Sequence, residues 1–454
     1  MMFRKRNLVV VLLLAAMAWN PLAAQDNEWT LEECINYALE NNITLKRQEL
    51  TTTSAQKDLT QSKLNALPNL NAQAVHNLAA GRILDEGTYE WVNTDIRQGN
   101  LGLAANFTIF SGFQGYNSMK MSEIIYKSSI ETMRYMENNV VLNIMTGYLE
   151  LLRREELYGI AIEKVKLTDL QVERMQKLLD VGNASSGELL EVKAQASKEK
   201  YNMTVARTQA NAARLELLQM MNLNEMEEFE IIRPRIQDPN LLKVPALAEV
   251  YNAAVTILPE VKSAEYNIEA SEKGLAIARG GLSPEIFAQA YYRSNYNNLL
   301  PNPLNAGDPY PYSQQLVDNQ YQQLSVGVTI PIFNRWQSRT QISKAKIDLE
   351  DSRLLLDDVK QKLFKEIQQY YAEALGAYDN YMAASESYAN SEEAYRFAEE
   401  KFKVGNATTL ELAEARNRLF ESQGNMVTTR YVFVFYLKIL DFYQGKDIFF
   451  EGQN

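Results

Sequence analysis

The sequence predicts an α+β protein in which one structural unit occurs twice, and three observations lead to this fold class. The tetrapeptide Val-Gly-Asn-Ala occurs at residues 181–184 and again at residues 404–407. In each half, short segments alternate apolar with small or polar side chains, which is typical of β-strands. Two proline-free stretches, residues 113–180 and 336–404, carry apolar residues at three- and four-residue steps, as long helices do. A duplicated chain indicates that the function is built from symmetry.

The first 24 residues have the features of a secretory signal peptide. A basic start at residues 4–6, an apolar run at 8–18 and a small-residue exit at 21–24 follow one another. A membrane anchor is the alternative, but the apolar run is too short to span a membrane comfortably and a cleavage-like site follows it. We therefore expect residues 1–24 to be removed and the mature chain to be exported.

Charge and cysteine content narrow the class of protein further. The 454-residue chain has a formal net charge of −11, and removal of the three basic residues at positions 4–6 makes the mature chain more negative still. Such a charge argues against a nucleic-acid partner. The only cysteine, Cys34, lies in a helical pattern and is expected to be a small buried side chain. Because no later stretch reads as a membrane-spanning helix, the exported chain is periplasmic, secreted or built of outer-membrane strands.

Each half of the chain opens in the same way. Pro68 and Pro284 are 216 positions apart, and the same offset aligns Ala38 with Ala254. The first opening segment begins with the capping-box spacing of residues 30–33, followed by apolar residues at helical steps. We expect one helix in each half, ending before the proline.

A strand hairpin follows each opening helix, at about residues 68–111 and 284–333. One face of each hairpin is apolar and the other is small or polar. Polar, broken sequence at 78–99 and the proline-rich stretch 294–323 predict the connecting loops. Strands of about ten residues are long enough to cross a membrane when tilted, although strands of a soluble sandwich alternate in the same way.

The remaining sequence is helical. At ~1.5 Å per residue each proline-free stretch makes a helix about 100 Å long, which implies coiled-coil packing. The offset between the halves is here 223, which aligns Gly182 with Gly405. Each glycine is suited to a left-handed C-cap, after which a returning helix runs from residue 188 or residue 411. The chain thus divides into a first repeat, 25–238, with a tip turn at 181–187, and a second repeat, 239–454, with a tip turn at 404–410.

This order of elements in an exported chain resembles the outer-membrane efflux protein family, the TolC-like channels. The likeness is carried by residues 31–42, by the strand-to-helix passages Phe110-Ser111-Gly112 and Pro331-Ile332-Phe333-Asn334, and by both Val-Gly turns. The resemblance implies a homotrimer in which four transmembrane strands per chain close one shared 12-stranded barrel in the outer-membrane lipid. It also implies a coiled-coil α-helical tunnel across the periplasm. Four strands alone would leave two unpaired edges in lipid, which is consistent with such an assembly.

The resemblance implies a function and its partners. Family members form the exit duct of a tripartite efflux pump or a type I secretion system, and a periplasmic adaptor (membrane fusion) protein holds them against an inner-membrane pump. The adaptor contacts the glycine turns, which in this chain are formed by Val181, Gly182, Asn183, Ala184, Val404, Gly405, Asn406 and Ala407. Since each glycine also ends a helix, a purely structural role for the turns is the alternative.

Four glutamates are the candidates for a gate at the periplasmic entrance. Glu411 and Glu414 lie where family members often carry carboxylates, and Glu188 and Glu191 are their counterparts in the first repeat. Like charges around a narrow axis attract cations. Residues 185–188 and 408–411 both have capping-box spacing, so Glu188 and Glu411 have helix capping as an alternative role.

Enzyme chemistry finds little support in the sequence. His76 is the only histidine, Cys34 is the only cysteine, and the motifs of a P-loop, a serine hydrolase elbow or a zinc protease are not found. We expect a protein that is not an enzyme and that has no catalytic site, cofactor or metal. The competing prediction is a periplasmic coiled-coil adaptor or scaffold, which should show one hairpin flanked by lipoyl-like β sequence rather than two matching strand hairpins.

Overall fold

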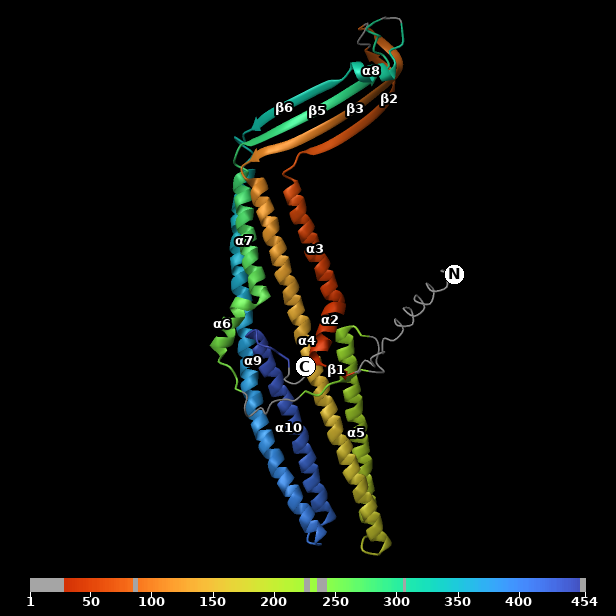
Figure 1. The fold of residues 1–454 in the computed structure, drawn as a ribbon, viewed down its shortest axis with the longest axis vertical. Helices are drawn as coiled ribbons and strands as arrows, with labels where there is room; N and C mark the ends of the chain where they lie inside the picture. Colours follow the sequence, from red (N-terminus) through yellow and green to blue (C-terminus); the bar gives the residue numbers. More distant parts are fainter. Residues whose placement is uncertain (1–27, 85–88, 224–228, 235–242, 305–307, 450–454) are drawn as a thin grey trace, which may run out of the picture. The chain divides into compact units, whose positions relative to one another are not determined.

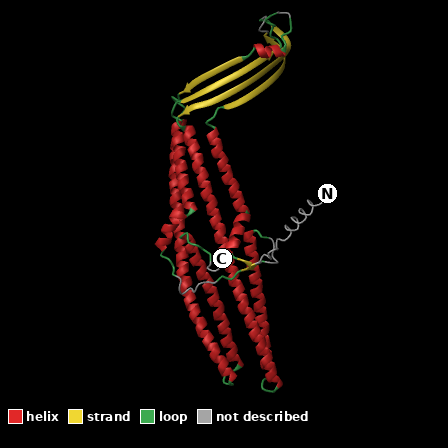
Figure 2. Cartoon of the chain, in the orientation of Figure 1, coloured by secondary structure: helices red, strands yellow, loops and turns green. Residues whose placement is uncertain are grey.

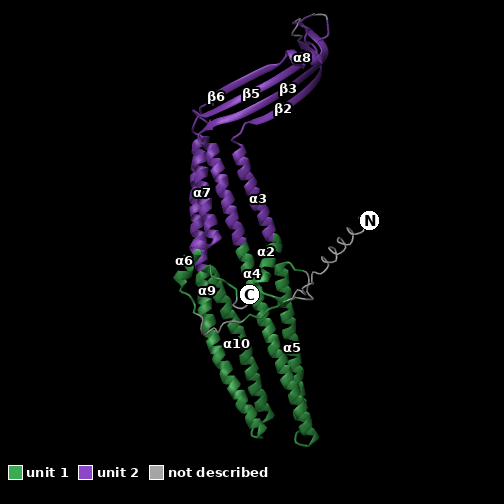
Figure 3. Ribbon diagram, in the orientation of Figure 1, with its two compact units in different colours: residues 1–43, 137–254, 366–454 green, residues 44–136, 255–365 purple. Residues whose placement is uncertain are grey.

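A computed structural model describes residues 28–84, 89–223, 229–234, 243–304 and 308–449. The predicted signal peptide, residues 1–24, and residues 235–242 at the boundary of the two repeats lie outside these described residues. The chain forms two compact units (Figure 3). Unit 1 consists of residues 1–43, 137–254 and 366–454, and unit 2 consists of residues 44–136 and 255–365. Each unit therefore draws on both halves of the sequence.

Unit 2 contains a four-stranded antiparallel sheet (Figures 1 and 2). Its strands are β2 (Asn69–Leu84), β3 (Trp91–Ser111), β5 (Glu285–Asn297) and β6 (Tyr321–Thr329), in the order β2-β3-β5-β6. The predicted loop at 78–99 is wrong, because β2 and β3 stay paired as far as Leu84 and Trp91. Strands of a hairpin pair through their backbone N–H and C=O groups, which does not require an apolar face. Polar side chains in the sequence therefore did not mark the end of the two strands.

The register gives the sheet one apolar and one polar face, since directly opposed residues point to the same side. Leu103 pairs with both Ala72 and Tyr292, and Ala290 pairs with both Ala105 and Leu324. The apolar face includes Leu70, Ala72, Leu101, Leu103, Phe107, Val326 and Val328. The polar face includes Asn69, Asn71, Gln73, Asn106, Gln289, Gln323 and Ser325. The alternation predicted from the sequence is therefore confirmed, except that Phe287 and Tyr291 of β5 lie on the polar face.

The helices of unit 2 meet through small polar side chains. The unit contains all of α3 (Ile43–Leu64) except its first residue, the whole of α7 (Pro259–Gly280), and the first parts of α4 (Gln114–Asp180) and α9 (Gln337–Lys403). The hydroxyl of Ser128 on α4 lies 3.0 Å from that of Ser263 on α7, and the hydroxyl of Ser271 lies 2.8 Å from that of Ser352 on α9. Short side chains of this kind allow two helices to approach closely.

Unit 1 is built on the remaining parts of α4 and α9. It also contains α2 (Leu31–Asn41), α5 (Ser186–Met221), most of α6 (Leu247–Ile257), α10 (Thr409–Tyr443) and the short parallel pair of β1 (Glu28–Trp29) with β4 (Glu230–Ile231). Tyr148 of α4 is fully buried beside this pair. Its hydroxyl donates to the carbonyl oxygen of Ile232 at 2.6 Å and lies 3.2 Å from that of Trp29. The phenol thus satisfies the carbonyl of Ile232, the residue after β4, and lies beside Trp29 of β1.

The element bounds follow the two offsets found in the sequence. α2 and α6 are 216 positions apart, as are β2 and β5, whereas α4 and α9, like α5 and α10, are 223 apart. The offset changes between β5 and α9, where the structure has the short helix α8 (Tyr312–Asp318). The predicted loop at 294–323 is therefore partly helical. The buried side chain of Gln315 fixes this turn of helix, a role that composition alone did not reveal.

The single opening helix predicted in each half is two helices. α2 ends at Asn41 before an extended Asn42, and α6 ends before an extended Leu258, which precedes Pro259. The extended conformation of Leu258 follows from the steric restriction that proline places on its predecessor. None of the helices in the described ranges combines the length and hydrophobicity that a membrane crossing requires.

Candidate functional site at the helical turns of unit 1

The two Val-Gly turns have the same backbone geometry. Gly182 follows α4 with φ +77° and Gly405 follows α9 with φ +79°. The N–H of Asn183 donates to the carbonyl of Leu178 at 2.8 Å, and that of Asn406 donates to the carbonyl of Lys401 at 2.8 Å. This hydrogen bond closes a Schellman motif, which confirms the predicted left-handed C-caps. A Cβ on either glycine would meet nothing within 4 Å, so glycine is favoured by backbone conformation and not by lack of space.

The turns present most of their predicted adaptor-contacting residues to solvent. Val181 and Val404 are each 70% exposed, and the glycine and asparagine that follow each valine are also exposed. Ala184 is half-buried and packs against a small core of Met175, Leu189 and Val192.

Glu188 and Glu411 cap the helices that leave the turns. The hydroxyl of Ser185 accepts from the N–H of Glu188 at 3.2 Å, and the carboxylate of Glu188 accepts from the N–H of Ser185 at 2.7 Å. Thr408 and Glu411 repeat both bonds, at 3.2 and 2.7 Å. The backbone N–H of the capping residue, followed by its hydroxyl, lowers the pKa of each carboxyl below its usual range. The capping role considered from the sequence is confirmed for both residues.

Glu191 and Glu414 lie three residues further along α5 and α10. Both are exposed, whereas the residues beside them, Val192 and Ala415, are buried. The structure therefore separates the four predicted gate residues into two that close capping boxes and two that are exposed in the second turns of the returning helices.

A buried polar cluster beyond the turns was not foreseen. Glu199 of α5 is 2% exposed, and its carboxylate lies 3.2 Å from the ammonium of Lys164 on α4 and also accepts from Gln195 and Asn202. Arg416 of α10 is 4% exposed and donates to Gln171 on α4. Burial lowers the pKa of Arg416, while the nearby Tyr395 and Glu199 oppose this effect. We name Lys164, Glu199, Gln171 and Arg416 the polar cluster.

The periodicity of the sequence contains a signal for this cluster. In α5 the buried residues follow at steps of three and four, namely Leu189, Val192, Ala196 and Glu199. A glutamate at an apolar position of that stripe indicates a buried charge, which requires a partner. The partner itself lies on another helix, so its identity follows only from the structure.

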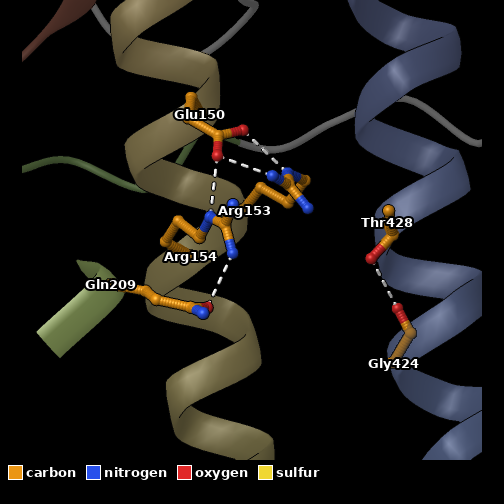
Figure 4. A network of polar contacts seen from close by, with 6 residues as sticks. All are labelled: Glu150, Arg153, Arg154, Gln209, Gly424 and Thr428. Carbon is orange, nitrogen blue, oxygen red and sulfur yellow. Dashed lines mark hydrogen bonds and ion pairs between the residues drawn. The ribbon is translucent and has the colours of Figure 1, made fainter. Parts of the chain in front are cut away.

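A second polar network joins α4 to α5 and lies further from the turns (Figure 4). The carboxylate of Glu150 accepts from Arg153 at 2.6 and 2.8 Å and from Arg154 at 2.7 Å, and Arg154 also donates to Gln209 of α5 at 2.7 Å. Burial raises the pKa of Glu150, but the bonds from both guanidinium groups outweigh it and leave the pKa lowered. On α10 the hydroxyl of Thr428 donates to the carbonyl of Gly424 at 2.8 Å.

A bidentate ion pair connects α10 to α4 as well. Arg430 donates through Nη2 to both oxygens of Glu156, at 2.6 and 2.7 Å. Together with the bond from Arg416 to Gln171, this contact places α10 alongside α4 from residues 416 to 430 of α10 and from 171 to 156 of α4. The helices that end at the turns are thus joined through charged and polar contacts as well as through apolar ones.

The other residues singled out from the sequence have structural surroundings. Cys34 is fully buried in α2, and burial, followed by the negative charge of Glu33, raises the pKa of its thiol. His76 lies on β2. Over the described residues, no group of three or more His, Cys, Asp and Glu side chains is placed to hold a metal ion.

Comparison with known proteins identifies the family. The model of the family described as outer membrane efflux protein matches residues 34–223 and 250–433. The outer membrane efflux protein BepC of Brucella suis biovar 1 (strain 1330) is 21% identical over 333 residues, which span 73% of this chain and 68% of BepC.

Solved structures of outer-membrane channels have the same fold. The CusC crystal structure superimposes with a TM-score of 0.75 at 16% identity, covering 92% of this chain and 93% of CusC. The CmeC outer membrane channel of Campylobacter jejuni gives a TM-score of 0.75 at 15% identity, covering 93% of this chain and 87% of CmeC. The chain therefore belongs to the outer membrane efflux protein family of TolC-like channels and is an outer-membrane protein that extends into the periplasm.

Proposed function

We propose that three copies of this chain assemble into a channel that is the exit duct of a tripartite efflux pump or a type I secretion system. The duct passes small molecules or proteins from an inner-membrane pump to the exterior. One observation carries the proposal: in the sheet order β2-β3-β5-β6, the outer edges of β2 and β6 have no strand partner among the described residues.

The two faces of the sheet support closure between copies. In lipid an unpaired strand edge costs several kcal/mol per unsatisfied backbone group, and pairing β6 of one copy with β2 of the next removes every edge. Three copies of four strands make a 12-stranded barrel. The apolar face, with Leu103 and Leu324, then contacts lipid, and the polar face, with Gln289 and Gln323, lines the lumen.

We assign the turns of unit 1 to contact with a periplasmic adaptor protein. Residues 25–238 and 239–454 act as two repeats, so three copies present six turns on a quasi-sixfold rim. The exposed Val181 and Val404 offer an apolar contact at each turn, and the fixed backbone of each glycine holds them in place. The adaptor in turn holds the inner-membrane pump.

The entrance of the duct lies near the same turns in this proposal. Glu191 and Glu414 lie exposed in the second turns of α5 and α10 and form the charged ring that attracts cations. Glu188 and Glu411 stand beside the ring, and their carboxylates hold the helix ends in shape through the capping boxes.

Single-channel recordings in planar bilayers test the gate. The double variant Glu191→Gln, Glu414→Gln should change conductance and weaken its block by divalent cations, while the fold is retained because both side chains are exposed. Glu421→Gln is the matched control, an exposed glutamate further along α10. Conductance and cation block that stay as in the unsubstituted channel would contradict the assignment of Glu191 and Glu414.

Crosslinking tests the partners. A photoreactive side chain at Asn183 or Asn406 should capture one periplasmic protein in cells, and the pump should co-purify with it. The same substitution at Glu421 should capture less of that protein. Antibiotic accumulation in a deletion strain then separates efflux from protein secretion, since only loss of efflux raises the intracellular drug concentration. Capture with equal yield at all three positions would contradict the proposed contact.

A further inference from the structure

The helix α8 lies on the apolar face of the sheet, at the end far from the helices of unit 2 (Figure 1). A Cβ built on Gly99 of β3 would lie 3.6 Å from a ring carbon of Tyr312 and 3.6 Å from Cβ of Tyr296. The hydroxyl of Ser294 donates to the carbonyl of Leu316 at 2.7 Å. Gly99, Ser294 and Tyr296 belong to the same face as Leu101 and Tyr292 by the strand register. α8 therefore covers the apolar side and not the polar side.

The α8 segment also takes the place of β6 along the last residues of β5. The pairing of the two strands ends at Arg293 and Tyr321. Beyond that pair, the amide of Gln315 accepts from the N–H of Asn297 at 2.9 Å and donates to its carbonyl at 3.1 Å. The amide of Asn319 donates to the carbonyl of Asn295 at 2.9 Å. Side-chain amides thus satisfy the edge that a strand would otherwise pair.

Gln315 is fully buried, and its second amide hydrogen reaches the carbonyl of Tyr310 at 2.9 Å. A strand end in water needs no such arrangement, because water satisfies its backbone groups. The same edge in an apolar medium loses several kcal/mol for each group left unpaired. A buried side chain that satisfies both backbone groups of Asn297 is what an edge without access to water requires.

The exposed side chains of α8 are of the apolar and aromatic kinds that are found at the interface between the bilayer and water. Val317 is 64% and Tyr312 is 44% exposed, and the only charged residue of the helix, Asp318, accepts from the hydroxyl of Tyr310 at 3.0 Å. From Ile286 to Tyr296, strand β5 rises about 25 Å along the membrane normal at a typical tilt, which is the height of the apolar band of a membrane sheet. α8 lies at the far limit of that band.

We propose that α8 is an interfacial element that lies outside the lumen, against the outer-leaflet lipid at headgroup level. The inference rests on the proposed function, which places the apolar face of the sheet in lipid. Aromatic and apolar side chains of this kind favour the interface, where one part of the side chain is apolar and the other reaches water. α8 thereby covers the edge of β5 and adds lipid contact without narrowing the channel.

Site-directed spin labelling tests this placement. On a Cys34→Ala background, single cysteines replace Val317 on α8, Leu324 on the apolar face and Gln323 on the polar face, each with a nitroxide. The channel is reconstituted in vesicles of phosphatidylethanolamine and phosphatidylglycerol, and collision with oxygen is compared with collision with a water-soluble nickel complex. The label at 317 should show a severalfold lower nickel collision rate than the label at 323, with the label at 324 lower still.

The three positions separate the possible failures. A label at 324 that lies in lipid, together with a label at 317 that behaves like the one at 323, would overturn the inference for α8 and leave the proposed function standing. A label at 324 that is in water would overturn both. Gln315→Glu, which cannot donate to the two carbonyls, should increase the mobility of the label at 317 severalfold, whereas Ser313→Ala on exposed α8 should not. Equal mobility in both variants would also overturn the inference.

Discussion

From the contacts of the polar cluster we predict that loss of the Glu199 carboxylate makes local opening of the helices that end at the turns more frequent. Glu199→Ala leaves the ammonium of Lys164, whose side chain is 20% exposed, without its carboxylate partner, and it removes a negative charge near the guanidinium of Arg416, which is 4% exposed. Removing one member of a buried pair costs roughly 3–5 kcal/mol, and the lower end applies because Lys164 keeps some water. A cost of about 3 kcal/mol corresponds to local opening that is about 150-fold more frequent.

Hydrogen exchange followed by mass spectrometry measures the frequency of this local opening. Amides in α5 around position 199 and in the facing part of α4 should exchange about 100-fold faster in Glu199→Ala. Glu191→Ala, eight residues earlier on the same helix and exposed, should change exchange there by no more than about twofold. Exchange in Glu199→Ala that matches exchange in Glu191→Ala would refute the reasoning, because it would show that the buried carboxylate does not hold the helices together.

Three further predictions concern single residues. Gly405→Ala should destabilise unit 1 by about 1–2 kcal/mol, because φ of Gly405 is +79°. Gly274→Ala in the middle of α7 should instead stabilise the protein by up to about 1 kcal/mol. Thermal unfolding measures both effects. Tyr148→Phe should cost about 1–3 kcal/mol in the same assay, since the carbonyl of Ile232 loses the hydroxyl that donates to it, whereas the carbonyl of Trp29 still accepts from the N–H of Ile232. The bonds from Thr408 that lower the pKa of Glu411 stabilise the start of α10 while the carboxylate is ionised. This contribution is complete above the usual carboxyl pKa and is lost as the pH falls through the lowered value. Glu411→Gln should therefore remove the pH dependence of hydrogen exchange at the start of α10.

Each of these has an outcome that contradicts it. Equal unfolding temperatures for the two glycine variants would show that the left-handed turn carries no strain. An unchanged unfolding temperature for Tyr148→Phe would show that water or another donor replaces the phenol. A pH dependence that persists in Glu411→Gln would assign it to another carboxyl.

The duplication and the polarity of the strands could be predicted from the sequence because both are local patterns. The repeated Val-Gly-Asn-Ala located both turns, and the spacing of Ser185 with Glu188 located a helix start that the structure has. Alternation over Leu101, Leu103 and Ala105 identified the apolar face of β3. Helix caps and strand faces depend on neighbours within a few residues, so one sequence is sufficient for them.

The features that sequence reasoning missed depend on contacts between distant segments. The ends of β2 and β3 are set by their mutual pairing, which runs through polar residues to Leu84 and Trp91. α8 forms in a stretch with four prolines because Gln315 finds its partners on β5. Glu199 and Arg416 lie on separate helices more than 200 residues apart in sequence, so their common surroundings follow only from the fold.

Disulfide trapping between copies tests the central claim most directly. On a Cys34→Ala background, one cysteine is placed near the start of β2, at Leu70 or Ala72, and one near the end of β6, at Val326 or Val328, and membranes are oxidised. If β6 of one copy pairs with β2 of the next, at least one combination will give covalently linked dimers and trimers, with no larger species. Monomers only in every combination, or an open ladder beyond the trimer, would contradict a closed barrel of three chains.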